Sequence, residues 1–187
     1  MVDFGQVAAA AKKYNVSNAP VELNISDEWR GRWVEDEPLP DGVPVLHLYG
    51  VLLMDDKGYV VRERGSQGAW ATIEGPVVAA EKPEAALRRI AKEQANAAPA
   101  RMEMVGFLDC RATSHNREHP RDSRSVRPIY LFAAKQVKDL GGTAAFERRR
   151  LPMNEYMVAI RNRYPEIDDY LPKAVERYMV LRAKAEL

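Results

Sequence analysis

In the segment GPVVAAE (residues 75–81), a glycine stands six positions before a glutamate, and the segment RIAKEQANA (residues 89–97) follows after seven further residues. The residues between them predict a helix over 83–95. Pro83 suits the first position of a helix, Glu84 favours its positive N-terminal end, and Asn96 can end it. Residues 75–97, here called the signature segment, therefore predict a loop followed by a short central helix.

The residues on both sides of the signature segment predict a β-sheet. The stretch at 45–53 is apolar at nearly every position, which is typical of a buried central strand. Turn residues at 55–58 followed by the segment 59–64 predict the returning arm of a hairpin. A short extended piece at 69–73 and two strands at 102–110 and 128–137 complete the predicted sheet.

The N-terminal part of the chain predicts elements that are added to this sheet. Residues 8–13 form an Ala-rich helical stretch, and residues 21–25 predict a first strand. Residues 35–44 contain three prolines and must form a loop. Trp29 and Trp33 lie just before this loop, and we expect them to cover the core.

The C-terminal part predicts two helices, because apolar residues recur there at helical spacing. The residues that form these two stripes are Met153, Tyr156, Met157, Ile160 and Tyr164 in the first helix, and Leu171, Ala174, Val175, Tyr178 and Leu181 in the second. We expect Pro165 and Pro172 to interrupt the helices, and Arg148–Arg150 to lie in solvent before them. The simplest interpretation of the stripes is a packed core, and the alternative is a face for a protein partner or a homodimer.

Composition restricts the class of protein. The chain has 187 residues, 46% of them hydrophobic, and 28 basic against 27 acidic side chains, which gives a net charge of +1. This balance argues against a domain-wide grip on nucleic acid. The single cysteine, Cys110, excludes an intramolecular disulfide and a cysteine-based zinc site. We expect a soluble, cytoplasmic protein, because no secretion signal and no apolar run of membrane-spanning length is present.

The signature segment resembles that of the Nudix hydrolases, Gly-x5-Glu-x7-Arg-Glu-U-x-Glu-Glu-x-Gly-U, in which U is a bulky aliphatic residue. The resemblance covers about residues 45–137. It implies an α/β fold, namely a Nudix-like α/β/α sandwich with a mixed sheet, plus an N-terminal segment and a helical C-terminal extension. We accordingly expect residues 45–140 to form the Nudix-like domain, residues 1–44 to pack on it, and residues 141–187 to complete it.

Four residues stand where the signature requires them: Gly75, Glu81, Arg89 and Glu93. The resemblance implies that Glu81 and Arg89 form a structural pair that links the loop to the helix, and that Glu93 is a metal-binding glutamate with a catalytic role. Members of the family typically cleave a phosphoanhydride in a nucleoside diphosphate linked to another group. This chemistry needs Mg²⁺ or Mn²⁺, because divalent cations neutralise the pyrophosphate and help to generate the nucleophilic water.

The signature also departs from the pattern at the residues that would bind metal. Ile90 replaces a glutamate and offers no oxygen, Gln94 replaces a second glutamate with a neutral amide, and Asn96 replaces the later glycine. The apolar side chain of Ile90 indicates a face that packs. Replacement carboxylates could come from Glu74, which also fits a solvated charge, or from Glu63 or Glu103.

The loop at 111–127 is rich in arginine. It contains Arg111, Arg117, Arg121, Arg124 and Arg127 against two acidic residues. Arginine forks match phosphate oxygens, so this loop is a candidate for holding the phosphates of a nucleotide, or for contacting RNA despite the near-neutral charge of the chain. The alternative is a solvated, mobile loop.

Three functions remain open from the sequence. The first is a divergent Nudix-like protein that binds a nucleoside-diphosphate-type or other phosphate-bearing small molecule with weak or no hydrolysis and no cofactor. The second is an active pyrophosphohydrolase that depends on Mg²⁺ or Mn²⁺. The third is a non-catalytic structural subunit of a larger assembly. The missing carboxylates belong to the reacting centre, so the sequence favours the first and third over the second.

Overall fold

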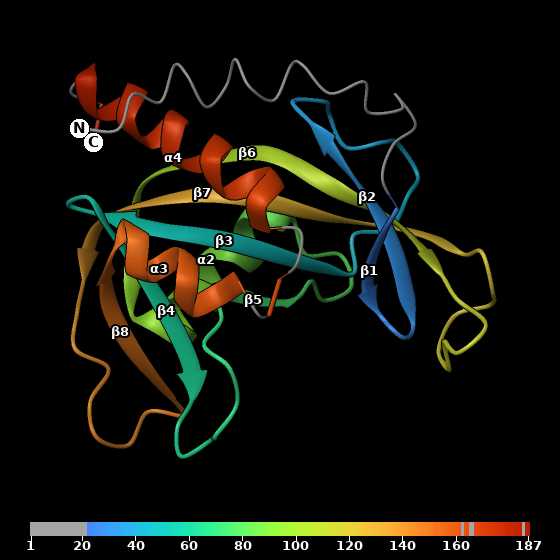
Figure 1. Cartoon of the computed structure of the whole chain (residues 1–187), viewed down its shortest axis with the longest axis horizontal. Coiled ribbons are helices and arrows are strands. Elements are labelled where there is room, and N and C mark those ends of the chain that lie inside the picture. The colour runs from blue at the N-terminus through green and yellow to red at the C-terminus, as the bar shows by residue number, and fades with distance from the viewer. Residues whose placement is uncertain (1–21, 162, 165–166, 185) are drawn as a thin grey trace.

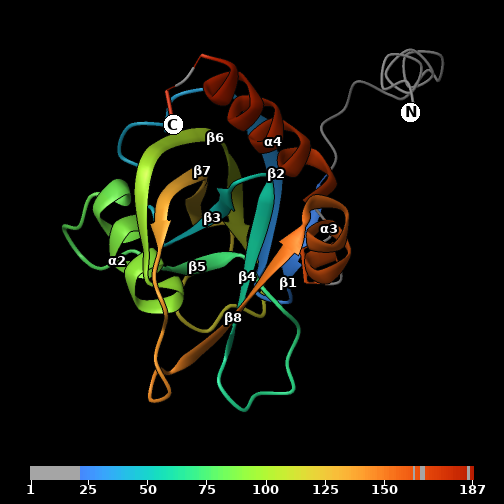
Figure 2. The same cartoon turned by 90° about the vertical axis from the view of Figure 1, so that its left-hand side faces the viewer.

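A computed structural model of the chain describes residues 22–161, 163–164, 167–184 and 186–187, and it has three layers. Helix α2 (Pro83–Ala95) covers one face of a mixed sheet, and helices α3 (Met153–Arg161) and α4 (Ile167–Ala183) cover the other. Figure 2 shows this arrangement, with α2 on one side of the strands and α3 and α4 on the other. The predicted α/β/α sandwich is therefore confirmed.

The sheet has eight strands, seven of which follow one another in the order β1-β2-β6-β7-β3-β4-β8 (Figure 1). The central pair, β3 and β7, is parallel and all other pairs are antiparallel. The short strand β5 pairs with the first half of β3. The bounds are β1 (Leu23–Ser26), β2 (Trp29–Glu35), β3 (His47–Met54), β4 (Lys57–Glu63), β5 (Ile73–Pro76), β6 (Ala97–Ala112), β7 (Arg124–Val137) and β8 (Phe146–Pro152).

The two faces of the sheet hold separate hydrophobic clusters. On the α2 side, Leu87 and Ile90 pack against Leu48 and Ile73. A Cβ atom on Gly50 would lie 2.8 Å from the Leu87 side chain, so the helix approaches the central strand at a residue without a side chain. This close approach brings the helix of the signature segment directly onto β3 and β5.

The predicted central helix and hairpin are confirmed, whereas β8 was missed. Arg148–Arg150 belong to a strand that pairs with β4, with Arg149 opposite Val60. Arg149 and Arg150 are exposed, as expected, whereas Arg148 is half-buried and donates hydrogen bonds to the carbonyl oxygens of Ala95 and Lys138. Three adjacent arginines give no strand pattern, so only the pairing with β4 reveals this element.

The C-terminal apolar stripes lie in the core. Tyr156 and Ile160 of α3 and Leu171 and Tyr178 of α4 are all buried against the sheet. The expected interruption at Pro172 is wrong, because α4 continues through it. Pro172 lacks the backbone N–H that the interior of a helix uses, and the neighbouring Leu171 is buried against the sheet.

Some expectations concern residues outside the described part. The predicted helix at 8–13, residue 21 of the first strand, and Pro165 are among them. Among the described residues, no helix combines the length and the hydrophobicity needed to cross a bilayer.

Candidate functional site

The loop of the signature segment is braced onto α2 by an arginine–glutamate pair. The two carboxylate oxygens of Glu81 accept hydrogen bonds from Nε and Nη2 of Arg89 at 3.0 and 2.8 Å. Arg89 Nη2 also donates to the carbonyl oxygen of Pro76 at 3.0 Å, so the same side chain holds both ends of the loop. The hydrogen bonds from Arg89 hold the pKa of the Glu81 carboxyl below its usual value. These contacts are those of a structural pair.

Gly75 and Ile90 meet where β5 passes under α2. A Cβ atom on Gly75 would lie 3.0 Å from Cδ1 of Ile90 and 3.2 Å from its Cγ1, so a larger residue at 75 would press on the isoleucine. Ile90 is only 1% exposed and belongs to the core cluster on this face of the sheet. The side chain at position 90 therefore packs in the interior and does not face a cation.

Asn96 ends α2 in the left-handed conformation, with φ 47° and ψ 41°. Its backbone N–H donates to the carbonyl oxygen of Lys92 at 3.1 Å. Asparagine tolerates this conformation better than other residues that carry a Cβ atom. The replacement of the signature glycine by Asn96 thus keeps the backbone geometry of the turn from α2 into β6.

Gln94 binds the backbone of β5 with its side-chain amide. Its Oε1 accepts a hydrogen bond from the backbone N–H of Glu74 at 3.1 Å, and its Nε2 donates to the backbone carbonyl oxygen of Glu74 at 2.7 Å. Both polar atoms of the side chain are used in this pair of bonds. Position 94 therefore has a structural contact where the signature has an acidic residue.

Glu93 is the one acidic side chain left among the three metal positions of the signature. It is 57% exposed, and its carboxylate lies 3.7 Å from Nη1 of Arg89, one helical turn earlier. In the described part of the chain, no three His, Cys, Asp or Glu side chains come together in a group that could hold a metal ion. In this arrangement, the residues around Glu93 do not fit a divalent cation.

Glu74 lies beside the signature but is committed to other partners. Its side chain is 14% exposed; Oε1 accepts hydrogen bonds from Nη2 and Nε of Arg163 at 2.6 and 3.1 Å, and Oε2 lies 3.5 Å from Nε2 of His47. Burial by itself raises the pKa of Glu74, but hydrogen bonds from His47 and Arg163 outweigh burial and leave this pKa below its usual value. The carboxylate is therefore ionised, and the guanidinium of Arg163 neutralises it.

The other two candidate replacement carboxylates, Glu103 and Glu63, lie on β6 and β4. Glu103 lies on β6, where Arg101 binds it at 3.0 Å and Arg177 of α4 lies 3.8 Å away. Glu63 is exposed at the end of β4. Neither joins Glu93 in a group of carboxylates.

A cleft of about 410 Å³ opens beside β5, and we call it the β5 cleft. It is bounded by β5, the end of β4, the loop that joins them, and the segment after α3. Polar side chains that line it are His47, Arg62, Glu63, Glu74, Gln94 and Arg163. Arg62 is held in place by the carboxylate of Glu147, with Nε 2.7 Å from Oε1, and it stacks on the ring of Trp70 at 4.4 Å.

The profile of the NUDIX domain matches residues 48–173, well over half of the chain. The chain belongs to the NUDIX domain family. The match begins in β3 and ends in α4, and it includes the signature segment, which is the Nudix box of this chain. Among curated proteins, no match to the sequence is found.

Solved structures of Nudix proteins resemble this one in fold. The pyrophosphohydrolase BsRppH of Bacillus subtilis is 14% identical, with a TM-score of 0.58, and the match covers 85% of this chain and 96% of that one. The NUDIX domain of NrtR from Shewanella oneidensis, in complex with ADP ribose, is 16% identical with a TM-score of 0.48, covering 76% and 93%. A MutT structure from a study of the Aliivibrio salmonicida and Vibrio cholerae proteins is 14% identical with a TM-score of 0.49, covering 72% and 98%.

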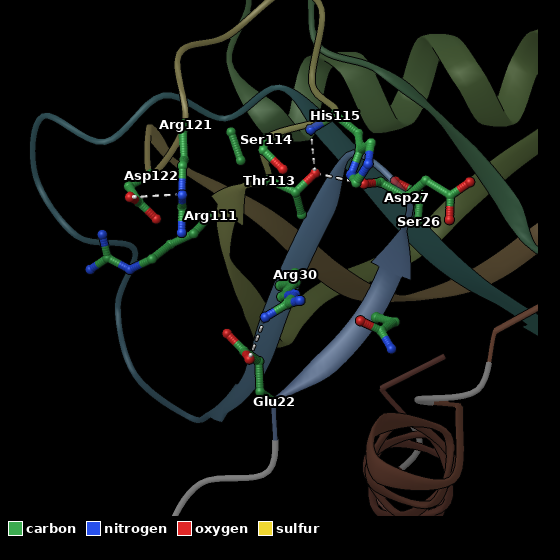
Figure 3. Close-up of a pocket in the computed structure, with 12 residues that line it drawn as sticks. Glu22, Ser26, Asp27, Arg30, Arg111, Thr113, Ser114, His115, Arg121 and Asp122 are labelled. Atoms are coloured by element: carbon green, nitrogen blue, oxygen red, sulfur yellow. Dashed lines mark hydrogen bonds and ion pairs between the residues drawn. The ribbon is translucent and has the colours of Figure 1, made fainter.

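A second, larger hollow of this Nudix domain lies away from the box. It has a volume of about 590 Å³ and is formed by the β1–β2 hairpin and the β6–β7 loop (Figure 3). Arg30 pairs there with Glu22 at 3.5 Å, and Arg121 with Asp122 at 3.6 Å. Because acidic side chains line this hairpin pocket together with the arginines, it is less suited to a polyanion than its arginine content suggests.

The predicted loop at 111–127 is shorter in the structure, because Arg111 belongs to β6 and Arg124 and Arg127 belong to β7. Its five arginines lie in different environments. Arg111 and Arg121 line the hairpin pocket, and Arg117 is exposed. Arg124 is paired with Asp109, with Nε 2.9 Å from Oδ1. Arg127 is half-buried, and its Nη1 donates to the hydroxyl of Tyr49 at 3.1 Å. The structure does not bring the five side chains together around one ligand-sized site.

Sequence reasoning missed how the basic side chains of the β5 cleft come together. Arg163 lies 89 residues from Glu74 in the chain, and Arg62 stands near the end of an ordinary strand pattern. His47 stands in an apolar strand, where a hydrogen-bonded core histidine is the simplest interpretation. No local signal in the sequence could bring these three residues together, because β3, β4 and the segment after α3 meet only in the folded chain.

Proposed function

We propose that this Nudix domain binds a nucleotide-type ligand that carries a diphosphate or another phosphate group, in the β5 cleft, with weak or no hydrolysis. The observation that carries this proposal is the use of two box positions for structure: Ile90 packs in the core and Gln94 binds the backbone of β5. The cleft beside them remains open, and Arg62 and Arg163 line it together with Glu63 and Glu74.

Weak hydrolysis follows from the charge at the box. A metal-assisted attack on a phosphoanhydride needs oxygen ligands that bring divalent cations to the diphosphate. At the metal positions of the box only Glu93 is acidic, and it faces Arg89. Glu74 is neutralised by Arg163. We therefore expect too few free carboxylates near Glu93 to recruit cations for efficient turnover.

Binding is supported by the two arginines of the cleft. Arg62 and Arg163 each use Nε and Nη2 to contact a carboxylate, Glu147 and Glu74 respectively. Within the described part of the chain, the hydrogen bonds and ion pairs of both guanidiniums come from Nε and Nη2 and not from Nη1. A guanidinium that is oriented by a carboxylate and retains free donors is well prepared to bind a phosphate oxygen, because less side-chain entropy is lost on binding.

The test is a ligand screen by thermal denaturation and calorimetry in a chelating buffer. ADP-ribose, nucleoside diphosphate sugars and inorganic pyrophosphate serve as probes, because ligands that bind only the native state raise its melting temperature. We expect a nucleoside diphosphate to stabilise the protein, and Arg62→Gln to weaken its binding by about tenfold or more, the loss expected for a charged hydrogen bond. Arg30→Gln, in the hairpin pocket, is the matched control and should leave the affinity unchanged.

Turnover is measured with the same compounds in the presence of Mg²⁺ or Mn²⁺. Efficient metal-dependent hydrolysis that disappears in Glu93→Gln would show that the domain is an active pyrophosphohydrolase and would refute the proposal of weak hydrolysis. If no phosphate-bearing compound binds, the proposal of a ligand-binding module fails.

A further inference from the structure

One edge of β5 is completed by a side chain. β5 pairs with β3 along one edge only, and in that pairing Glu74 lies opposite Tyr49. The backbone N–H and carbonyl of Glu74 bind Gln94 on α2 at 3.1 and 2.7 Å. A side-chain amide carries a donor and an acceptor side by side, as a peptide group does. Gln94 therefore acts on this edge as a neighbouring strand would.

A glutamate at this position could not make the same two contacts. An ionised carboxylate can accept a hydrogen bond from the N–H of Glu74, but it has no proton to donate to the carbonyl oxygen. Two oxygen atoms would then face each other at about the hydrogen-bond distance of 2.7 Å that now separates Nε2 from the carbonyl oxygen. Only a proton or a cation between them would remove the repulsion, and a divalent cation prefers such hard oxygen ligands.

We propose that the side-chain amide of Gln94 takes the place of a divalent cation between α2 and β5. The helix and the strand of this box are then held together without metal. The residues around it are consistent with this role: Ile90 fills the space under the helix, and the nearby carboxylate of Glu74 is neutralised by Arg163. The proposal concerns how the box is held together, and it stands whether or not the β5 cleft binds a diphosphate.

The test compares wild type with Gln94→Glu and Gln94→Met by thermal denaturation of the full chain. In a chelating buffer near neutral pH, both variants should melt about 2–4 °C or more below wild type, because each loses the amide bonds. Addition of Mn²⁺ at about 1–10 mM should restore more than half of this loss in Gln94→Glu. The same Mn²⁺ should leave wild type and Gln94→Met within about 1 °C of their melting temperatures without metal.

A second measurement follows the melting temperature of Gln94→Glu as a function of pH, because a proton on the introduced carboxyl group can replace the cation. When protonated, the introduced carboxyl group can donate to the carbonyl oxygen of Glu74, so folding raises its pKa. This stabilisation is present at low pH and is lost as the pH rises through the raised pKa. Without metal, the melting temperature of Gln94→Glu should therefore approach that of wild type at about pH 5 and fall below it at about pH 8. Gln94→Met should show no such trend.

The location of the cation is measured by paramagnetic broadening. In Gln94→Glu, Mn²⁺ should broaden the amide resonances of residues 73–75 and 93–95, and in wild type it should not. Saturable broadening of these resonances in wild type would overturn the proposal, because the amide would then not exclude the cation.

The melting experiments can also overturn the proposal. They do so if neither Mn²⁺ nor acid raises the melting temperature of Gln94→Glu more than that of Gln94→Met. If Gln94→Glu is unfolded without metal, recovery of its folded spectrum by Mn²⁺ or acid supports the proposal, and failure to recover contradicts it.

Discussion

The Nudix box of this chain contains positions that shape the backbone and positions that bind metal in the resemblance, and the two sets differ in how closely they match the signature. The positions that shape the backbone keep their function: Gly75 allows the close approach of Ile90, Arg89 braces the loop through Glu81, and Asn96 adopts the left-handed turn. The positions that bind metal in the resemblance, 90, 93 and 94, provide a core side chain, an exposed ion pair and a backbone clamp.

Backbone geometry and charge are therefore separable requirements of the box. A left-handed turn can be made by asparagine as well as by glycine, so Asn96 preserves the fold without preserving the residue. A cation site needs several ionised oxygens at once, and each loss weakens the reason to keep the others. Once a buried carboxylate has no cation, a hydrophobic or amide side chain is more stable in its place.

The largest loss of stability is expected for Ile90→Glu, which places a carboxylate at a metal position of the signature that is 1% exposed in this chain. We expect the free energy of unfolding, measured by urea denaturation near neutral pH, to fall by about 3–5 kcal/mol, the cost of a buried charge without a partner. Ile90→Val is the matched control, with an expected loss of about 0.5–1.5 kcal/mol. If Ile90→Glu were as stable as Ile90→Val, position 90 would have to be open to water or to a cation.

The next effect concerns the neutralised carboxylate of Glu74. We expect Glu74→Gln to lower the free energy of unfolding by about 1–3 kcal/mol at pH 7, because Arg163 loses its charged partner. The folded-state pKa of Glu74 is below its usual value of 4.5, so its stabilising contribution is present above that value and is lost as the pH falls through the lower folded pKa.

Urea denaturation from neutral to acid pH checks this prediction. The difference between wild type and Glu74→Gln should shrink as the pH falls below 4.5. Asp168→Asn removes an exposed partner of Arg161 and should cost only about 0–1 kcal/mol. A difference that stays constant with pH would mean that the pair with Arg163 does not stabilise the ionised carboxylate.

A smaller effect on stability is expected at Asn96, one of the positions that shape the backbone of the box. Its φ of 47° is costly for a residue with a Cβ atom, so we expect Asn96→Ala to be about 1 kcal/mol less stable than Asn96→Gly in urea denaturation. Equal stability of the two variants would indicate that the side-chain hydrogen bond from Asn96 to the carbonyl oxygen of Asp139, and not the backbone conformation, determines the choice of residue.

The smallest effect is expected at the residue that matches the metal pattern best. Glu93 is 57% exposed and its ion pair with Arg89 spans 3.7 Å, so Glu93→Gln should change the free energy of unfolding by less than about 0.5 kcal/mol. Mg²⁺ titration followed by thermal denaturation should give the same curve for the variant as for wild type. A Mg²⁺-dependent stabilisation that Glu93→Gln removes would contradict the proposal that this box holds its backbone geometry without binding a cation.

Several features of this protein follow from local sequence alone. The helix at 83–95, its proline start and its asparagine end were predictable, because capping and helical periodicity depend on neighbouring residues. The central strand and the hairpin after it were predictable for the same reason, and the fixed spacing of Gly75, Glu81 and Arg89 identified the family.

Other features were decided only by tertiary structure. β8 exists because Arg148–Arg150 lie along β4, a partner some 90 residues earlier that no local pattern indicates. The side chains that contact the Glu74 carboxylate, His47 and Arg163, come from β3 and from the segment after α3. The amide of Gln94 finds its backbone partner only when α2 lies on β5. Local sequence determines what each segment can form, but the neutralisation of a charge and the pairing of a strand edge require segments that meet only after folding.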